Sequence, residues 1–83
     1  MKKYMIGLLV TNKYGVLTRI ASLFARRGYN IDTLTVGETV NPQVSRMTIM
    51  ITGNDHDRDQ MIKQLRKLHD VHFVKEMVAE KSV

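Results

Sequence analysis

The 83-residue chain contains no cysteine and no glycine-rich loop, and each absence excludes a class of function. Without cysteine there can be no disulfide, no thiolate metal ligand and no cysteine nucleophile. Without a glycine-rich loop the sequence lacks the usual signature for binding the phosphates of a nucleotide. Ser22 and Ser45 have no acid and base companions in a pattern typical of a catalytic triad. An enzyme is therefore the least favoured class.

Long apolar runs are also missing, since no segment approaches the roughly 18 apolar residues that a membrane-spanning helix needs. The N-terminal segment, MKKYMIGLLV, faintly resembles a secretory signal. However, its apolar run is short, and the following Thr11-Asn12-Lys13 contains no small-residue cleavage site. These features predict a soluble cytoplasmic protein.

The net charge of +5 and a pI near 9.8 raise the possibility of nucleic-acid binding. The basic residues are dispersed, however, and Arg26-Arg27 and Arg66-Lys67 fall at the ends of predicted helices, where cations interact favourably with the helix dipole. A sheet that reads RNA would also carry aromatic side chains on its central strands. The predicted strand 44–52 has none. RNA binding is disfavoured, although the charge leaves it open.

The histidines offer a weak metal signal. His69 and His72 have an HxxH spacing, but the spacing spans a helix end and a strand start, so the two rings need not converge. Only Asp70 lies nearby as a third candidate ligand. We therefore expect no metal site.

Hydrophobic periodicity predicts six elements in the order strand, helix, strand, strand, helix, strand. Their predicted ranges are 3–10, 16–27, 31–40, 44–52, 57–69 and 71–78. Gly28 is expected to end the first helix in a left-handed conformation. The apolar stripe of the first helix is Leu17, Ile20, Ala21 and Phe24 (Leu23 at its margin), and the inner side of the second carries Met61, Ile62, Leu65 and Leu68. The two middle strands alternate, with Leu34, Val36 and Val40 on one face of the first of them and Met47, Ile49 and Ile51 on one face of the other.

This order of elements predicts an α+β fold, a ferredoxin-like βαββαβ sandwich whose four-stranded antiparallel sheet carries two helices on one face. We expect residues 1–78 to form the domain and residues 79–83 to be a frayed tail. A domain of this size buries only about 60 % of the surface of its unfolded chain. The strand 31–40 falls at a sheet edge, where a second copy can pair with it. We therefore expect a side-by-side homodimer.

The loop Thr11–Gly15 opens directly onto the first helix, whose first N–H groups have no partner within the helix. Asn12 and Gly15 are common turn residues, and that interpretation alone explains them. Alternatively, the amides of Gly15, Val16 and Leu17 bind a carboxylate, and the Asn12 side chain holds the rest of a small ligand. Asn30 has the same two interpretations: a loop residue, or a polar contact supplied across the dimer seam.

The quoted segments also carry a family resemblance. The pattern N-x-x-G-V-L-x-R-x-x-x-L-F-x-R-R-G-Y-N-I-D starts at Asn12, and S-R-M-T-I and K-Q-L-x-K-L-x-D-V follow it. Over residues 2–78 the chain resembles the ACT domain of the regulatory small subunit of acetolactate (acetohydroxyacid) synthase. Longer members of that family have a second, C-terminal domain, so the resemblance is to a short form, an excised domain or a stand-alone paralogue.

The resemblance implies a non-catalytic subunit without a cofactor, whose partner is the catalytic large subunit of a thiamine-diphosphate-dependent synthase. It further implies activation of that subunit and feedback inhibition by a branched-chain amino acid, chiefly valine, bound between two ACT domains. The alternative is a stand-alone ACT-domain sensor that acts on another partner. The residues that match the family's effector site are Asn12, Gly15, Val16 and Leu17 of one copy and Asn30 and Ile31 of the other.

Overall fold

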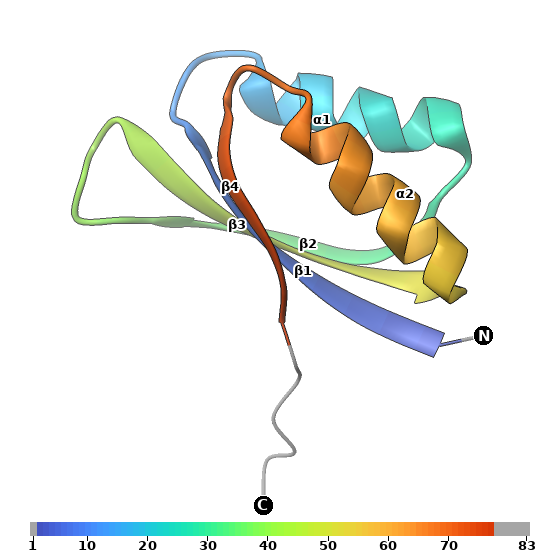
Figure 1. The fold of residues 1–83 in the computed structure, drawn as a ribbon. Coiled ribbons are helices and arrows are strands. Elements are labelled where there is room, and N and C mark those ends of the chain that lie inside the picture. The colour runs from blue at the N-terminus through green and yellow to red at the C-terminus, as the bar shows by residue number, and fades with distance from the viewer. Residues whose placement is uncertain (1, 78–83) are drawn as a thin grey trace, which may run out of the picture.

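The computed structural model describes residues 2–77, which form six elements in the predicted order (Figure 1). These elements are β1 (Lys2–Thr11), α1 (Val16–Arg27), β2 (Asn30–Glu38), β3 (Val44–Gly53), α2 (Asp55–Arg66) and β4 (Val71–Met77). The expected frayed tail, residues 79–83, lies outside the described residues. Neither helix is long and apolar enough to cross a membrane, within the part of the chain that the structure describes.

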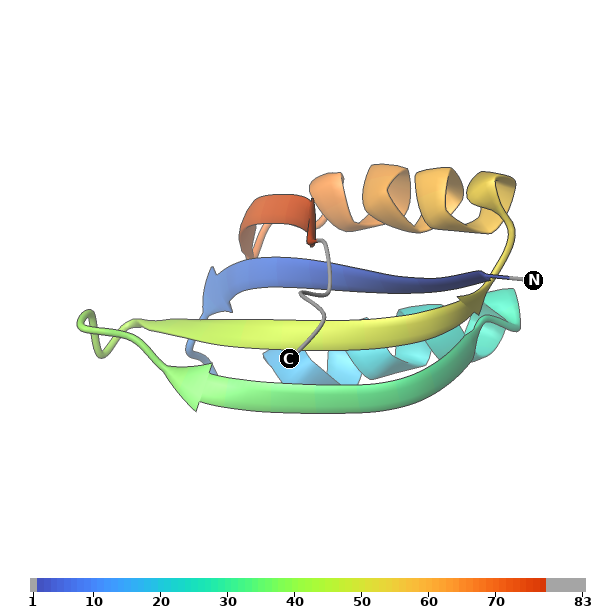
Figure 2. The same cartoon turned by 90° about the horizontal axis from the view of Figure 1, so that it is seen from below.

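The four strands form one antiparallel sheet in the order β2-β3-β1-β4, and both helices cover the same face of it (Figures 1 and 2). This is the predicted ferredoxin-like sandwich. The strands β2 and β4 occupy the two edges, so the prediction that the second strand is an edge strand is confirmed. The face opposite the helices is uncovered within residues 2–77 (Figure 2).

The core lies between the sheet and the two helices. Its fully buried members come from the inner faces of β1, β3, α1 and α2. The predicted inward sets of β3 and α2 are confirmed, except that Ile62 and Leu68 are only partly buried. The buried hydrophobic residues are Tyr4, Ile6, Leu8, Val10, Val16, Ile20, Phe24, Met47, Ile49, Ile51, Met61, Leu65 and Val74.

Helix α1 has the predicted bounds but presents a different face to the core. Its buried residues are Val16, Ile20 and Phe24, spaced at i, i+4 and i+8. Leu17 and Ala21, which were predicted to face inward, are exposed. Because successive helical residues are about 100° apart, burial of Val16 turns Leu17 out of the inward stripe. Gly28 ends the helix with a φ of 71°, as predicted.

Strand β2 ends two residues earlier than predicted, and most of its side chains are exposed. It ends at Glu38, and Val40 lies fully exposed in the β2–β3 hairpin loop. The pairing register shifts between Ile31 and Thr33, which marks a bulge at Asp32.

Helix α2 begins two residues earlier than predicted because Asn54 caps it. The Asn54 side chain accepts a hydrogen bond from the Asp57 amide at 2.8 Å, and the Asp57 carboxylate accepts one from the Asn54 amide at 3.1 Å. This reciprocal arrangement is a capping box. The helix ends at Arg66 rather than His69, because the amides of Lys67 and Leu68 donate to carbonyls three residues back and so tighten the last turn.

A polar cluster joins β1, α2 and β4 at the far end of the sheet. The Tyr4 hydroxyl donates a hydrogen bond to the Asp55 carboxylate. The Arg58 guanidinium lies 5.1 Å from the centre of the Tyr4 ring and 3.2 Å from the Glu76 carboxylate. The Tyr4 hydrogen bond lowers the pKa of Asp55, and the same bond raises the pKa of the Tyr4 hydroxyl.

Candidate functional site

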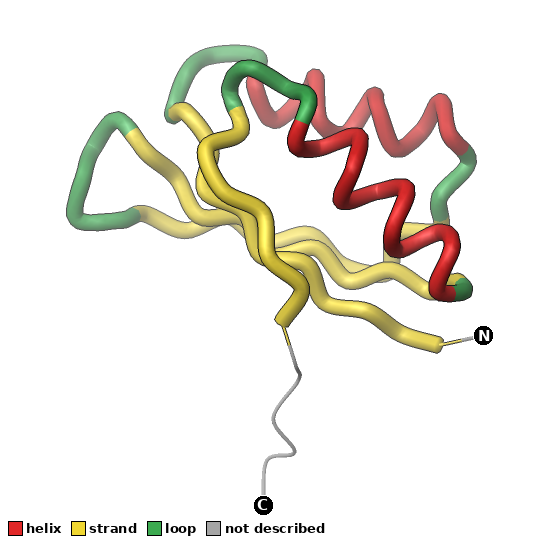
Figure 3. The backbone as a smooth tube through the Cα atoms, in the orientation of Figure 1, coloured by secondary structure: helices red, strands yellow, loops and turns green. Residues whose placement is uncertain are grey.

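The β1–α1 loop lies between the β2–β3 hairpin and the turn that connects α2 to β4 (Figure 3). The Asn12 amide donates to the Gln43 carbonyl of the hairpin at 2.8 Å. The Thr11 amide donates to the Asp70 carbonyl of the α2–β4 turn, also at 2.8 Å. The loop is therefore fixed on both sides by backbone hydrogen bonds, which is what a preformed binding site requires.

Side chains reinforce the second of these attachments. Arg19, in the second turn of α1, places Nη1 2.7 Å from a carboxylate oxygen of Asp70, which is only 8 % exposed. The Thr11 hydroxyl lies 2.8 Å from Nε2 of His72. This contact gives His72 a partner on β1, and no group of three or more potential metal ligands occurs within residues 2–77.

Gly15 starts α1 in a left-handed conformation, with φ 88° and ψ −11°. Such a backbone favours glycine because a Cβ atom is strained there. As a result the helix has no side-chain cap, and its first turn contains no acidic residue. The Val16 amide donates to the Lys13 carbonyl at 3.2 Å, whereas the amides of Gly15 and Leu17 have no acceptor within the described residues.

Two unpaired N–H groups at the positive end of a helix dipole can bind a small anion. No carboxylate side chain of the first turn competes for them. The loop can therefore hold a carboxylate through backbone groups alone.

The Asn12 side chain is divided between two roles. Its Nδ2 donates to the Pro42 carbonyl at 3.0 Å, so the amide nitrogen is committed to the hairpin. Its Oδ1 makes no hydrogen bond within residues 2–77 and can accept one from a ligand's ammonium group. The hairpin contact therefore leaves the oxygen of Asn12, rather than its nitrogen, to face a ligand.

Sequence reasoning missed the hairpin as part of this site. Asn41-Pro42 was predicted only as a turn, yet residues of the hairpin line a hollow of about 230 Å³ together with Asn12. The Thr39 Oγ1 lies 2.8 Å from the carbonyl oxygens of both Asn41 and Val44 and donates its single proton to one of them, which fixes the loop's shape. The predicted topology could have identified the hairpin, because an antiparallel β3 beside β1 must start where β1 ends, which places the hairpin next to the β1–α1 loop.

The structure does not bring all six predicted ligand residues together in one copy of the chain. Asn12, Gly15, Val16 and Leu17 lie together at the end of β1. Asn30 pairs with Thr52, which pairs with Lys3, so Asn30 lies at the opposite end of the sheet, as does its neighbour Ile31. Lys3 and Thr11 are eight residues apart on one strand, which corresponds to about 26 Å.

Exposed apolar side chains occur beside the free edge of the sheet. Leu34 pairs with Ile49 and Val36 with Met47, so both lie on the helix-bearing face, yet they are 38 % and 45 % exposed. Leu17 of α1 is 42 % exposed. Apolar residues next to an unpaired strand edge are typical of a surface that another chain covers.

Comparison with known proteins places these features in one family. The family model described as "AHAS small subunit-like ACT domain" matches residues 6–73. A probable acetolactate synthase small subunit of Archaeoglobus fulgidus is 52 % identical over 81 residues, which are 98 % of this chain and 50 % of that protein. The acetolactate synthase small subunit of Aquifex aeolicus is 47 % identical over 76 residues, covering 92 % of this chain and 40 % of that protein.

Among solved structures, the acetolactate synthase small subunit of Thermotoga maritima has a TM-score of 0.86 and 43 % identity, over 92 % of this chain and 47 % of that one. The ACT domain of a GTP pyrophosphokinase from Chlorobium tepidum has a TM-score of 0.79 at 18 % identity, a likeness of fold alone. The chain spans about half the length of the small subunits that it matches.

Proposed function

Because this chain belongs to the family of acetolactate synthase small subunit ACT domains, we propose that it is a non-catalytic regulatory subunit that binds a branched-chain amino acid, with valine preferred. In this proposal two copies bind the amino acid between them and control the catalytic subunit of the synthase. The observation that carries it is the pair of unpaired amides, Gly15 and Leu17, at the uncapped start of α1.

The homodimer would form through β2. If two copies of β2 pair antiparallel about a two-fold axis at Leu34, Asn30 of the partner subunit lies opposite Glu38, since each is four residues from the axis. Glu38 lines the hollow beside Asn12. This pairing would unite the two halves of the predicted ligand set and cover the exposed side chains of Leu34 and Val36. It would also satisfy the unpaired backbone groups of the edge strand.

In this dimer the amino acid's carboxylate binds the amides of Gly15 and Leu17, where the helix dipole adds about 0.3–2 kcal/mol. Its ammonium group binds Asn12 Oδ1. Its isopropyl group packs between Leu17 and Ile31 of the partner subunit. Every contact uses a group that is exposed or without a partner in a single described copy, apart from Ile31, which is half-buried.

Regulation requires the ligand to favour one arrangement of the two copies over another. A ligand between them can do so because its contacts depend on how they are placed. Discrimination among branched-chain amino acids should be modest, since one methylene in an apolar pocket changes affinity by about 1–3 kcal/mol. We therefore expect valine, leucine and isoleucine all to bind, with valine the tightest.

Calorimetric titration of the purified chain with valine, leucine, isoleucine and alanine tests the proposal. We expect saturable binding of the three branched-chain amino acids and much weaker binding of alanine, whose methyl group fills less of the pocket. No heat or thermal shift with any branched-chain amino acid at millimolar concentration would refute the effector assignment.

A second candidate function is a stand-alone amino-acid sensor that acts on another partner. It would bind its amino acid through the same unpaired amides at the start of α1. Activity of the synthase's catalytic subunit, measured with and without this chain, separates the two functions. Activation and valine inhibition support the first, whereas amino-acid binding without an effect on the enzyme supports the second.

A further inference from the structure

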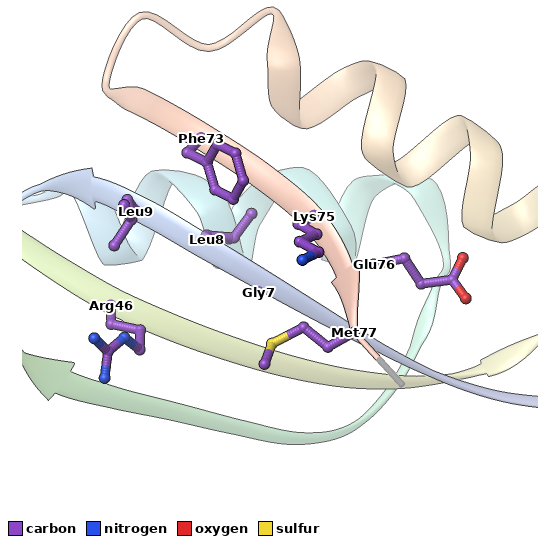
Figure 4. A pocket seen from close by; sticks show the side chains of 8 residues that line it. All are labelled: Gly7, Leu8, Leu9, Arg46, Phe73, Lys75, Glu76 and Met77. Carbon is purple, nitrogen blue, oxygen red and sulfur yellow. The ribbon is translucent and has the colours of Figure 1, made fainter. Parts of the chain in front are cut away.

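The face of the sheet opposite the helices (Figure 2) carries an apolar groove, whose lining side chains are drawn in Figure 4. Residues paired across neighbouring strands share a face of the sheet, so the register defines this surface row by row. Its rows are Gly37–Arg46–Leu9–Phe73, Thr35–Thr48–Gly7–Lys75 and Thr33–Met50–Met5–Met77. We call this surface the open face.

The groove has a volume of about 510 Å³, and Gly7 lies at its base. Because Gly7 has no side chain, Met77 folds across it, and a Cβ atom there would lie 2.6 Å from the Met77 sulfur. Phe73 and Leu9 border one end of the groove (Figure 4). Phe73 is 52 % exposed and Met77 43 % exposed, so two large apolar side chains remain in contact with water.

The charge on the groove has one sign. Arg46 and Lys75 both line it, and neither forms an ion pair with any residue between 2 and 77. Glu76 also lies at its border, but its side chain is directed away from Met77 and Phe73 (Figure 4) and is bound to Arg58 at 3.2 Å. The groove therefore combines exposed apolar side chains with two cations that no neighbouring carboxylate neutralises.

We propose that the open-face groove is the docking surface for the catalytic subunit of the synthase. The segment that it receives presents apolar side chains flanked by carboxylates. This inference rests on the proposed function, because it names the surface through which the regulatory subunit meets its enzyme.

Charge decides against a second copy of this chain as the occupant. Two open faces packed against each other would bring Arg46 and Lys75 of both copies into one desolvated interface, and like charges there cost several kcal/mol. Pairing of two β2 strands, by contrast, leaves the open face of both copies uncovered. The effector site and the groove can then be occupied together.

The groove is also physically connected to the effector loop. Leu9 borders the groove, and Asn12 follows only three residues later, about 10 Å along the chain. Thr11, between them, is attached by its amide to Asp70 and by its hydroxyl to His72, so β1 and β4 are held together at this end. A change in the loop on ligand binding would thus reach the strand pair that forms the groove.

The test compares two groups of variants in binding to the catalytic subunit from the same organism, measured by sedimentation and calorimetry. Arg46→Glu/Lys75→Glu reverses the charge of the groove, and Phe73→Ser removes its largest apolar contact. Lys63→Glu/Lys67→Glu is the matched control, since it makes the same charge change at two exposed positions, one in α2 and one at its C-cap. Circular dichroism and valine titration verify that each variant is folded and retains its effector site.

We expect both groove variants to weaken association by roughly ten-fold or more, and the control to change it by about two-fold or less. Raising the salt concentration should weaken binding of the wild type to the catalytic subunit more than binding of the charge-reversed variant.

Wild-type affinity in both groove variants, or equal weakening by the control, would overturn the inference and leave the proposed function intact. If the wild-type chain forms a tetramer and Phe73→Ser converts it to a dimer, the inference is overturned, because a second copy of this chain then occupies the groove. Failure of the wild type itself to bind the catalytic subunit would refute the regulatory role and the groove together.

Discussion

Replacing Gly15 with aspartate places a fixed carboxylate at the start of α1, where we locate the carboxylate of the effector. No atom lies within 4 Å of the Cβ position, so the change causes no collision. It does impose strain, because the φ of 88° must be adopted by a residue with a side chain, at a cost of about 1–2 kcal/mol. The measured effect on binding must therefore be separated from this strain.

Gly15→Asn provides the matched control. Asparagine has the same shape as aspartate and tolerates the left-handed conformation, but it carries no charge. The difference between the two variants is therefore the repulsion between two carboxylates. At a separation of about 4 Å this repulsion is about 1 kcal/mol in bulk water and about 4 kcal/mol near a protein surface.

We accordingly expect valine to bind Gly15→Asp about 5- to 1000-fold more weakly than Gly15→Asn, in isothermal titration at low ionic strength. The difference in valine affinity between the two variants should become smaller at high salt, because salt screens exposed charges. Thermal unfolding of both variants checks that their stabilities match. Equal valine affinities for the two variants would refute the placement of the carboxylate on α1.

Two further predictions concern stability and assembly. Tyr4→Phe removes the hydrogen bond that holds the pKa of Asp55 below its ordinary value of 3.8. That contribution to stability is present above pH 3.8 and is lost as the pH falls through the folded-state pKa, so urea unfolding between pH 2 and 6 should show a weaker acid dependence in the variant. Leu34→Lys places a charge on the exposed apolar edge and should shift the chain towards monomer in sedimentation equilibrium, whereas Val40→Lys, in the fully exposed hairpin, should not. Equal shifts in both lysine variants would contradict dimerisation through β2.

The bounds of a helix were predicted correctly where a single residue sets them. Gly15 and Gly28 bracket α1, and its bounds were predicted to the residue. The start of α2 was missed because Asn54 and Asp57 cap each other, an arrangement in which the helix begins before its apolar pattern does. The inward face of α1 was missed because Val16 and Leu17 are both apolar, and only packing against the sheet decides which of them is buried.

The candidate site was predictable only in part, for a physical reason. The β1–α1 loop is local, so its glycine and the helix that follows can be read along the chain. The contact of Asn12 with Pro42 joins residues 30 positions apart and depends on the sheet order. Any role of Asn30 in this site requires the proposed second copy, because in a single copy it lies at the other end of the sheet.

This division of the site has a thermodynamic consequence that can be measured. If each effector needs groups from both copies, it binds the dimer and not the monomer, and valine must stabilise the dimer. A ligand at 100 times its dissociation constant contributes about 2.7 kcal/mol per site. A symmetric dimer has two such sites, so the dissociation constant of the dimer should fall by about 10⁴-fold. Sedimentation velocity across a dilution series, with and without saturating valine, measures this directly. A monomer–dimer equilibrium that valine leaves unchanged would show that one copy forms the whole site, and the assignment of Asn30 and Ile31 would then be wrong.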